Sequence, residues 1–174
     1  KTFATNQMNY FVLSTELLEI ISESNDGRIV NVASNAHIGA EVDYENINSE
    51  KNFSAWTSYC VSKLMNIMFT YQLSSIQDKV SVNVLHPGFV DTNIAGNEGN
   101  FIKYIVKLGA KMFARTVDSG ADSSIYLSTS DEVQNVSGKY FFKCKEIKSS
   151  RASYNKEDWQ KVWDLCNEYK IKLI

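Results

Sequence analysis

Two short apolar runs on either side of a long helical stretch constrain the fold of this chain more than any other feature. The runs are RIVNVAS, residues 28–34, and VSVNVLHPG, residues 80–88. Both are rich in β-branched residues, and the first is apolar on both faces, as a buried strand is. Between them, apolar residues recur at helical spacing around Tyr59 and on to about residue 76. Strands joined through a crossover helix run parallel, so the sequence predicts a parallel sheet with helices on both faces.

The rest of the chain predicts further helices and one more strand. Apolar residues at helical spacing favour a helix over residues 5–24, ended by Asn-Asp-Gly. Residues 36–54 are polar and acidic, which indicates a loop that is functional or partly mobile. The predicted class is therefore α/β, with three strands and flanking helices. Beyond residue 88 we expect a loop over 89–100, helices over 101–114 and 116–128, a strand over 137–142 and a last helix over 155–172.

Composition and charge argue against several classes of function. The 174 residues carry a net charge of -2 with a pI near 5.7, so no nucleic acid is expected as the principal partner. The three cysteines, Cys60, Cys144 and Cys166, form no CxxC pair and no cysteine–histidine cluster. This pattern argues against a disulfide framework and against a zinc site, so no metal is expected. It favours an intracellular location, in the cytoplasm or at the cytosolic face of an internal membrane.

Tyr59 and Lys63 stand four residues apart in the helix that is predicted to continue to about residue 76. This spacing places them on one face of the helix, one turn apart. The unperturbed pKa of a tyrosine is about 10, and an ammonium within about 4–6 Å favours the ionised phenol. The pair could therefore exchange protons near neutral pH. An ordinary surface helix with the same spacing is the plain alternative.

Two further segments are expected to reach the same place. Ser34 ends the first strand, and residues 86–92, HPGFVDT, leave the second one. Both therefore lie at the carboxyl edge of the parallel sheet, where open α/β folds bind their ligands. The crossover brings Tyr59 back to this edge. A hydroxyl donor, a phenol beside an amine and a turn containing Thr92 thus converge on one crevice.

Four segments, TNQMNYFVLS, GRIVNVASNAH, YCVSK and VNVLHPGFVDT, follow one another in an order that resembles the short-chain dehydrogenase/reductase family. DYENINSEKNFSAWTSYCVSKLMNIMFTYQL and VSGKYFFKCKEIKSS resemble its retinol dehydrogenase-like branch. The resemblance implies a Rossmann-like doubly wound parallel sheet and an NAD(P)-dependent oxidoreductase. Such an enzyme would interconvert an alcohol and an aldehyde or ketone by hydride transfer. The branch implies NADP, with NAD as the alternative, and a lipophilic, retinoid-like substrate.

The resemblance also implies roles for individual residues. Tyr59 would be the general acid/base, and Lys63 would lower its pKa and bind the nicotinamide ribose. Ser34 would hydrogen-bond the substrate oxygen, and Asn6 matches the asparagine that helps to hold a water in the family's proton relay. The residues expected to contact the cofactor are Tyr59, Lys63, Pro87, Gly88, Val90 and Thr92.

One part of the family's pattern is missing from the sequence. The glycine-rich phosphate loop, T-G-x-x-x-G-x-G, does not occur in it. In the family this loop belongs to a preceding βαβ half. We therefore expect residues 1–174 to be the C-terminal part of a single short-chain dehydrogenase/reductase domain, with the N-terminal phosphate-binding half absent from the chain. The strand at 28–34 would then be an apolar edge, exposed to aggregation or to pairing with another chain.

Other interpretations stay open. A truncated or catalytically retired family member could act as a binding or scaffold protein, which the missing loop favours and the intact Ser34, Tyr59 and Lys63 oppose. The helix predicted over residues 101–114 could be a lid over a lipophilic substrate, or it could make a peripheral contact with a membrane surface. Formation of a homodimer is also open. The apolar residues proposed for the lid are Phe101, Ile102, Ile105 and Met112.

Overall fold

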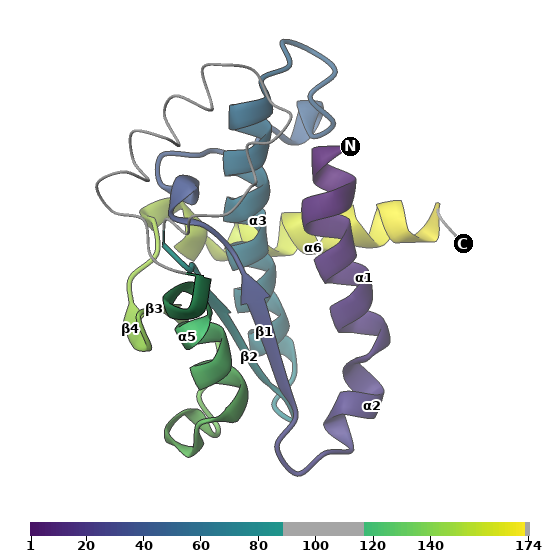
Figure 1. Ribbon diagram of the computed structural model, residues 1–174. Coiled ribbons are helices and arrows are strands. Elements are labelled where there is room, and N and C mark those ends of the chain that lie inside the picture. Colours follow the sequence, from purple (N-terminus) through teal and green to yellow (C-terminus); the bar gives the residue numbers. More distant parts are fainter. Residues whose placement is uncertain (89–116, 173–174) are drawn as a thin grey trace.

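A single sheet determines the position of the other elements. In the computed structural model, which describes residues 1–88 and 117–172, four strands lie in the order β1-β2-β3-β4 (Figure 1). β1 (Arg28–Val32) pairs in parallel with β2 (Ser81–Leu85), and β2 pairs in parallel with β3 (Tyr140–Phe142). β4 (Lys145–Ile147) runs antiparallel to β3. The predicted α/β class with a parallel sheet is confirmed, and the described sheet has one strand more than expected.

Helices cover both faces of this sheet. α1, α3 and α6 lie on one face, and α5 lies on the other (Figure 1). Among the described residues, no helix is both long and apolar enough to cross a membrane. The loop and helix predicted over residues 89–114 lie outside the described residues. The helical elements are η1 (Ala4–Met8), α1 (Asn9–Glu16), α2 (Leu18–Ser22), η2 (Asn35–His37), η3 (Tyr44–Asn46), α3 (Ala55–Ile76), α5 (Val117–Thr129), η5 (Asp131–Val133), η6 (Arg151–Tyr154) and α6 (Lys156–Ile171).

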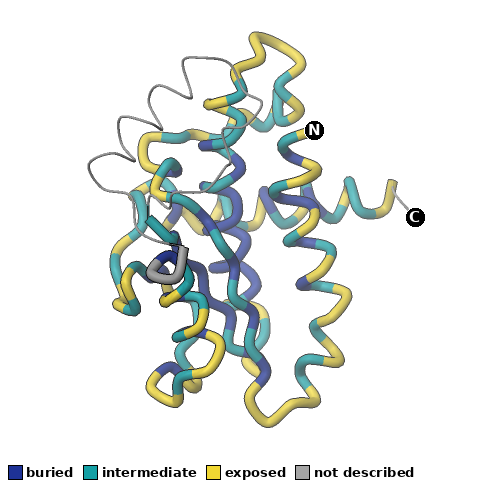
Figure 2. Tube along the Cα trace, viewed as in Figure 1, coloured by how far each residue is buried: buried dark blue, intermediate teal, exposed yellow. Residues whose placement is uncertain are grey.

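The core is built around α3, which lies between α1 and α6 and against the sheet. Figure 2 shows the buried residues gathered along α3 and the strands, and exposed residues on the outer sides of α1 and α2. Phe69 of α3 is fully buried, and its ring lies 5.5 Å from that of Phe11 and 6.0 Å from that of Trp163, between centroids. Burial of such large apolar side chains supplies most of the driving force that holds the three helices together.

Two buried asparagines join the strands to the elements beside them. Asn31 of β1 donates from Nδ2 to Thr70 Oγ1 of α3 at 2.9 Å. Asn83 of β2 donates from Nδ2 to the carbonyl oxygen of Val136 at 2.6 Å and accepts from the backbone N–H of Lys139 at 3.1 Å. A buried amide is tolerated where hydrogen bonds satisfy it. These bonds align α3 with β1, and the segment before β3 with β2.

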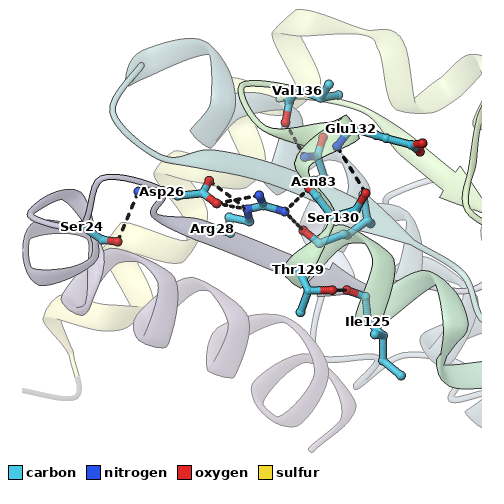
Figure 3. A network of polar contacts seen from close by, with 10 residues as sticks. Ser24, Asp26, Arg28, Asn83, Ile125, Thr129, Ser130, Glu132 and Val136 are labelled. Atoms are coloured by element: carbon cyan, nitrogen blue, oxygen red, sulfur yellow. Dashed lines mark hydrogen bonds and ion pairs between the residues drawn. The ribbon is translucent and has the colours of Figure 1, made fainter.

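Arg28 fixes the end of α5 to the beginning of β1 (Figure 3). Its guanidinium donates to the carbonyl oxygens of Leu127 at 3.1 Å and Ser130 at 2.8 Å, and it forms an ion pair with Asp26 at 2.6 Å. The last carbonyl groups of a helix have no partner within it, and a positive charge is favourable there. The contact therefore attaches α5 to the face of the sheet opposite α3.

The antiparallel strand β4 is the element that the sequence interpretation missed. β3 and β4 are joined by Lys143 and Cys144, whose φ angles are 51° and 60°. Two-residue hairpin turns of this kind usually carry asparagine or glycine, because most side chains disfavour positive φ. The Lys-Cys pair gave no such signal, so the sequence did not reveal the hairpin.

Candidate active site

Tyr59 and Lys63 lie in the first part of α3, at the carboxyl edge of the sheet. α3 begins after Ser54, whose Oγ accepts a hydrogen bond from the backbone N–H of Thr57 at 3.2 Å and so caps the helix. Lys63 Nζ lies 5.8 Å from the centroid of the Tyr59 ring. Both side chains are partly buried. The structure therefore brings the phenol and the amine together on one helix face.

The amine of Lys63 is held at the end of β1. Its Nζ donates to the carbonyl oxygen of Val32 at 3.0 Å and to Asn66 Oδ1 at 3.4 Å. Burial lowers the pKa of Lys63 to about 8, because the charged form loses solvation. The amine thus titrates closer to neutral pH than an exposed lysine does.

Asn6 reaches the same turn of α3 from the opposite helix. It lies in η1, a π-helical turn, and such turns are frequent at functional sites. Asn6 Nδ2 donates to Ser62 Oγ at 3.1 Å, and Ser62 Oγ donates to the carbonyl oxygen of Tyr59 at 2.7 Å. Asn66 Nδ2 donates to the carbonyl oxygen of Asn6 at 2.8 Å. These bonds link Asn6 to Lys63 through Asn66 and reach Tyr59 at its backbone carbonyl oxygen, while the Tyr59 ring lies beside Lys63 Nζ.

Ser34 follows β1 and caps η2, which packs against α3. Its Oγ accepts a hydrogen bond from the backbone N–H of Ala36 at 3.2 Å, which leaves the hydroxyl hydrogen for another acceptor. His37, fully buried, donates from Nδ1 to the Ser34 carbonyl oxygen at 2.7 Å and accepts at Nε2 from the backbone N–H of Ser150 at 3.0 Å. Burial lowers the pKa of His37, so the imidazole stays neutral and anchors the loop that carries Ser34.

The cofactor-binding residues predicted after the second strand are described only in part. Pro87 and Gly88 follow β2 directly, and Gly88 has a φ of 82°, which favours glycine. The backbone N–H of Gly88 donates to His86 Nδ1 at 3.2 Å, and the His86 ring stacks on Phe142 with centroids 4.2 Å apart. Val90 and Thr92 lie outside the described residues.

Two residues that sequence reasoning missed complete the group. Asn66 links Lys63 to η1, and its Nδ2 also donates to Gln7 Oε1 at 2.9 Å. Tyr10 donates from its hydroxyl to the Val32 carbonyl oxygen at 3.1 Å, and Lys63 Nζ lies 5.6 Å from the centroid of its ring. The available signal was spacing: Asn66 stands three residues after Lys63, and Tyr10 stands four residues after Asn6.

Comparison with known families shows to which family the chain belongs. The family described as short chain dehydrogenase matches residues 1–102, which is more than half of the 174 residues. The chain belongs to the short-chain dehydrogenase family. The matched range contains all four predicted catalytic residues, Asn6, Ser34, Tyr59 and Lys63.

A curated relative is similar to the chain in sequence, and two solved structures are similar to it in fold. The chain is 35% identical to human retinol dehydrogenase 14 over 176 residues, which cover 99% of the chain and 52% of that protein. A crystal structure of an uncharacterised Mycobacterium paratuberculosis protein superimposes with a TM-score of 0.69 at 23% identity, over 94% of this chain and 56% of the other. Gluconate 5-dehydrogenase from Burkholderia cenocepacia, crystallised with NADP and tartrate, superimposes with a TM-score of 0.58 at 19% identity, over 80% of this chain and 52% of the other.

This short-chain dehydrogenase chain thus resembles the retinol dehydrogenase-like branch, as the sequence predicts. It spans about half the length of the relatives it matches. The two structural matches support the fold, an α/β sheet with flanking helices. Enzymes of the family use NAD(P).

Proposed function

We propose that the protein containing this chain is an NAD(P)-dependent oxidoreductase that interconverts an alcohol and a carbonyl compound, with Tyr59 as general acid/base. The observation that carries this proposal is the hydrogen-bonded group at the carboxyl edge of the sheet. It joins Asn6 to Lys63 through Asn66 and to the backbone carbonyl oxygen of Tyr59 through Ser62, with Lys63 Nζ 5.8 Å from the centroid of the Tyr59 ring. Ser34 follows the strand to which Lys63 is bonded. A phenol beside a buried amine is suited to proton exchange with a substrate oxygen.

The donor set of the site fits a nicotinamide cofactor. Lys63 carries three N–H donors, and its hydrogen bonds within the described residues go to the Val32 carbonyl oxygen and Asn66 Oδ1, so one donor is left for a ribose hydroxyl. The turn at Pro87 and Gly88, and the predicted contacts Val90 and Thr92, would lie along the nicotinamide. When bound, the cofactor donates or accepts the hydride. NADP is the form we propose, with NAD as the alternative.

The residues of the chain would handle the proton and the charge on the substrate oxygen. During reduction, the Tyr59 hydroxyl gives its proton to the carbonyl oxygen as that oxygen becomes an alcohol. The Ser34 Oγ accepts a hydrogen bond from the backbone N–H of Ala36. The Ser34 hydroxyl donates its own hydrogen to the substrate oxygen and stabilises the negative charge that develops there. Asn6 keeps its side-chain oxygen available to hold a water in the relay. Oxidation runs the same steps in reverse.

The proposed substrate is lipophilic. Apolar side chains at the carboxyl edge are well exposed, with Phe53 at 67% and Trp56 at 52%, and the Trp56 ring lies 5.9 Å from that of Tyr59, between centroids. Exposed apolar groups beside a reactive phenol would bury an apolar substrate body. The name of retinol dehydrogenase 14 supports a retinoid-like alcohol or aldehyde. The predicted lid residues over 101–112 lie outside the described residues.

We also propose that the phosphate-binding half of the domain lies in residues that this sequence does not include. The chain spans about half the length of its relatives, and the glycine-rich loop does not occur in it. In the described sheet β1 is an edge strand, paired only with β2. A further strand beside β1 would complete a doubly wound sheet and cover this edge.

The test is Tyr59→Phe, which keeps the ring and removes the proton donor. In the complete protein, with retinal and NADPH, we expect kcat to fall by about 10²-fold to 10⁴-fold, the usual contribution of general acid/base catalysis. Tyr126→Phe is the matched control, because its hydroxyl bonds Glu132 on the opposite face of the sheet. Turnover of Tyr59→Phe within a fewfold of the parent would refute the assignment.

The second candidate is a catalytically retired family member that acts as a binding protein, which the missing phosphate loop favours. Such a protein would bind an apolar ligand without turnover and without a nicotinamide cofactor. Titration with NADPH, followed by thermal shift and by cofactor fluorescence, separates the two functions. Saturable NADPH binding supports the oxidoreductase, and its absence from the complete protein supports the binding protein.

A further inference from the structure

We propose that Tyr10 is a positioning residue for the proposed reaction, holding the Lys63 ammonium in place with its ring face and through the Val32 carbonyl oxygen that both residues share. This inference rests on the proposed function, because it assigns the residue that orients Lys63 in that site. Tyr10 lies on α1, four residues after Asn6 of η1, so two consecutive helical elements each supply a residue to the site.

Three contacts define the arrangement. The Tyr10 hydroxyl donates to the Val32 carbonyl oxygen at 3.1 Å, and Lys63 Nζ donates to the same oxygen at 3.0 Å. Lys63 Nζ also lies 5.6 Å from the centroid of the Tyr10 ring, within the range of a cation–π contact. The Lys63 ammonium, the Tyr10 ring and the Val32 carbonyl group therefore contact one another. If Nζ moves away from β1, it loses both its hydrogen bond to Val32 and its contact with the Tyr10 ring.

The surroundings of Lys63 indicate that the Tyr10 ring favours the charged form of the Lys63 amine. Burial favours the neutral amine and lowers the Lys63 pKa to about 8. The groups recorded around Nζ are the Tyr10 ring of α1, the carbonyl oxygen of β1, and Tyr59 and Asn66 of α3. The described contacts of Nζ include no carboxylate, and His37 of η2 is directed at Ser34 and Ser150. The negative face of the Tyr10 ring therefore opposes the effect of burial.

Tyr10 acts on Lys63 and not on the substrate. Burial raises the pKa of Tyr10, and the nearby phenol of Tyr59 raises it further, although the hydrogen bond to Val32 opposes both effects. Its hydroxyl thus keeps its proton and serves as a donor to the Val32 carbonyl oxygen. A protonated Tyr10 leaves proton transfer to Tyr59 and keeps the charge of Lys63 beside it.

The first experiment compares Tyr10→Phe, which keeps the ring, with Tyr10→Leu, which removes it, in the complete protein. Tyr10→Phe loses the hydroxyl's bond to Val32 but keeps the ring, so its kcat is expected to fall less than that of Tyr10→Leu, which loses both and falls by about tenfold or more. In Tyr10→Leu the alkaline limb of the pH profile should move down by about half a pH unit to one unit, because Lys63 loses its proton more easily. An unchanged limb in folded Tyr10→Leu would overturn the proposal.

Tyr44→Leu is the matched control. Tyr44 is also half-buried, with Lys161 Nζ 5.6 Å from its ring centroid and its hydroxyl bonded to Asp158 at 3.1 Å, and it has no part in the site. A purely structural role for Tyr10 predicts that both leucine variants change stability alike and that neither moves the pH profile.

A second measurement decides the question even if Tyr10→Leu does not fold or the protein shows no turnover. Pentafluorophenylalanine at position 10 has nearly the shape of phenylalanine but reverses the charge distribution of the ring face. Titration of the Lys63 amine by NMR, without cofactor, should give a lower pKa with the fluorinated ring than with Tyr10→Phe. Equal pKa values would overturn the role of Tyr10 and would leave the proposed function, tested separately by Tyr59→Phe, unaffected.

Discussion

Replacing Lys63 with methionine is expected to stabilise the folded protein at neutral pH, although it removes a residue proposed for catalysis. Methionine has a similar length and no charge. The Lys63 ammonium is largely buried at the end of β1, where the described contacts of Nζ include no carboxylate to offset the lost solvation. The substitution therefore removes a cost that the native site carries.

The pKa of Lys63 gives the size of this cost. Burial lowers it from 10.5 to about 8. At about 1.36 kcal/mol for each pKa unit, the charged form is disfavoured by about 3 kcal/mol relative to the unfolded chain. Methionine forfeits the hydrogen bond to Val32, worth about 1.5 kcal/mol or more, but the Tyr10 hydroxyl still satisfies that carbonyl oxygen. We expect a net gain of about 1–2 kcal/mol in the free energy of unfolding at pH 7.

The pH dependence provides the sharper test. The folded pKa lies below the unfolded one, so between about pH 8 and about pH 10.5 the unfolded chain holds a proton that the folded chain has released. As the pH rises through this window, the stability of the parental protein should therefore increase relative to that of Lys63→Met. Below the window, the difference in stability between the two proteins stays constant. Taking the difference between the two proteins cancels the contribution of the buried tyrosines, which they share.

Urea unfolding of the complete protein at a series of pH values measures this difference. Lys161→Met is the control, since Lys161 is 58% exposed and its replacement should change stability by no more than about 0.5 kcal/mol. A difference between parent and Lys63→Met that stays flat from about pH 7 to about pH 10.5 would contradict the reasoning. So would a Lys63→Met variant that is less stable than the parent at pH 7.

Two further predictions concern the loop that carries Ser34 and the proposed substrate surface. Because burial lowers the pKa of His37, the parental protein should lose stability as the pH falls below about 6.5. His37→Gln, which does not titrate, should lose less stability over the same acid range in the same urea assay. Trp56→Ala should raise KM for retinal by about tenfold, because the substrate loses apolar contact area, whereas Ile76→Ala, equally exposed at 52% but at the far end of α3, should leave KM unchanged. If the parent and His37→Gln lose the same stability in acid, the first expectation is contradicted. If Trp56→Ala and Ile76→Ala have the same KM for retinal, the second is contradicted.

The positions of the main elements could be predicted from apolar periodicity. The helix expected to run to residue 76 is α3, and the runs at 28–34 and 80–88 contain β1 and β2. The helix predicted over residues 5–24 is interrupted at Leu17, whose ψ of -5° separates α1 from α2. Periodicity shows which face of a helix is apolar, but a local break changes that pattern too little to be detected.

From the residues alone, the candidate site was predictable where residues are close in sequence or follow neighbouring strands, as Ser34 does, and Asn6 was predicted only from the resemblance to the family. Tyr59 and Lys63 lie on one helix, so their spacing alone placed them together. Tyr10 and Asn66 were missed, because their roles depend on how α1 packs against α3. That packing is fixed by tertiary contacts such as the bond from Asn66 to the Asn6 carbonyl oxygen, and no pattern within either helix encodes it.

The contacts that hold the proton-transfer groups come from η1, α1, β1 and α3, all within residues 1–88. The buried chain of polar bonds continues from Asn66 through Gln7 to Cys166 of α6, so the site is tied to the core on its inner side. None of these bonds requires a phosphate-binding half. If that half joins β1 in the complete protein, it should therefore govern the affinity for the cofactor, whereas the pKa of Lys63 and its dependence on Tyr10 should be nearly the same with and without it. A Lys63 pKa that moves by more than about one unit when the half is present would show instead that the buried environment of the amine is completed from outside these residues.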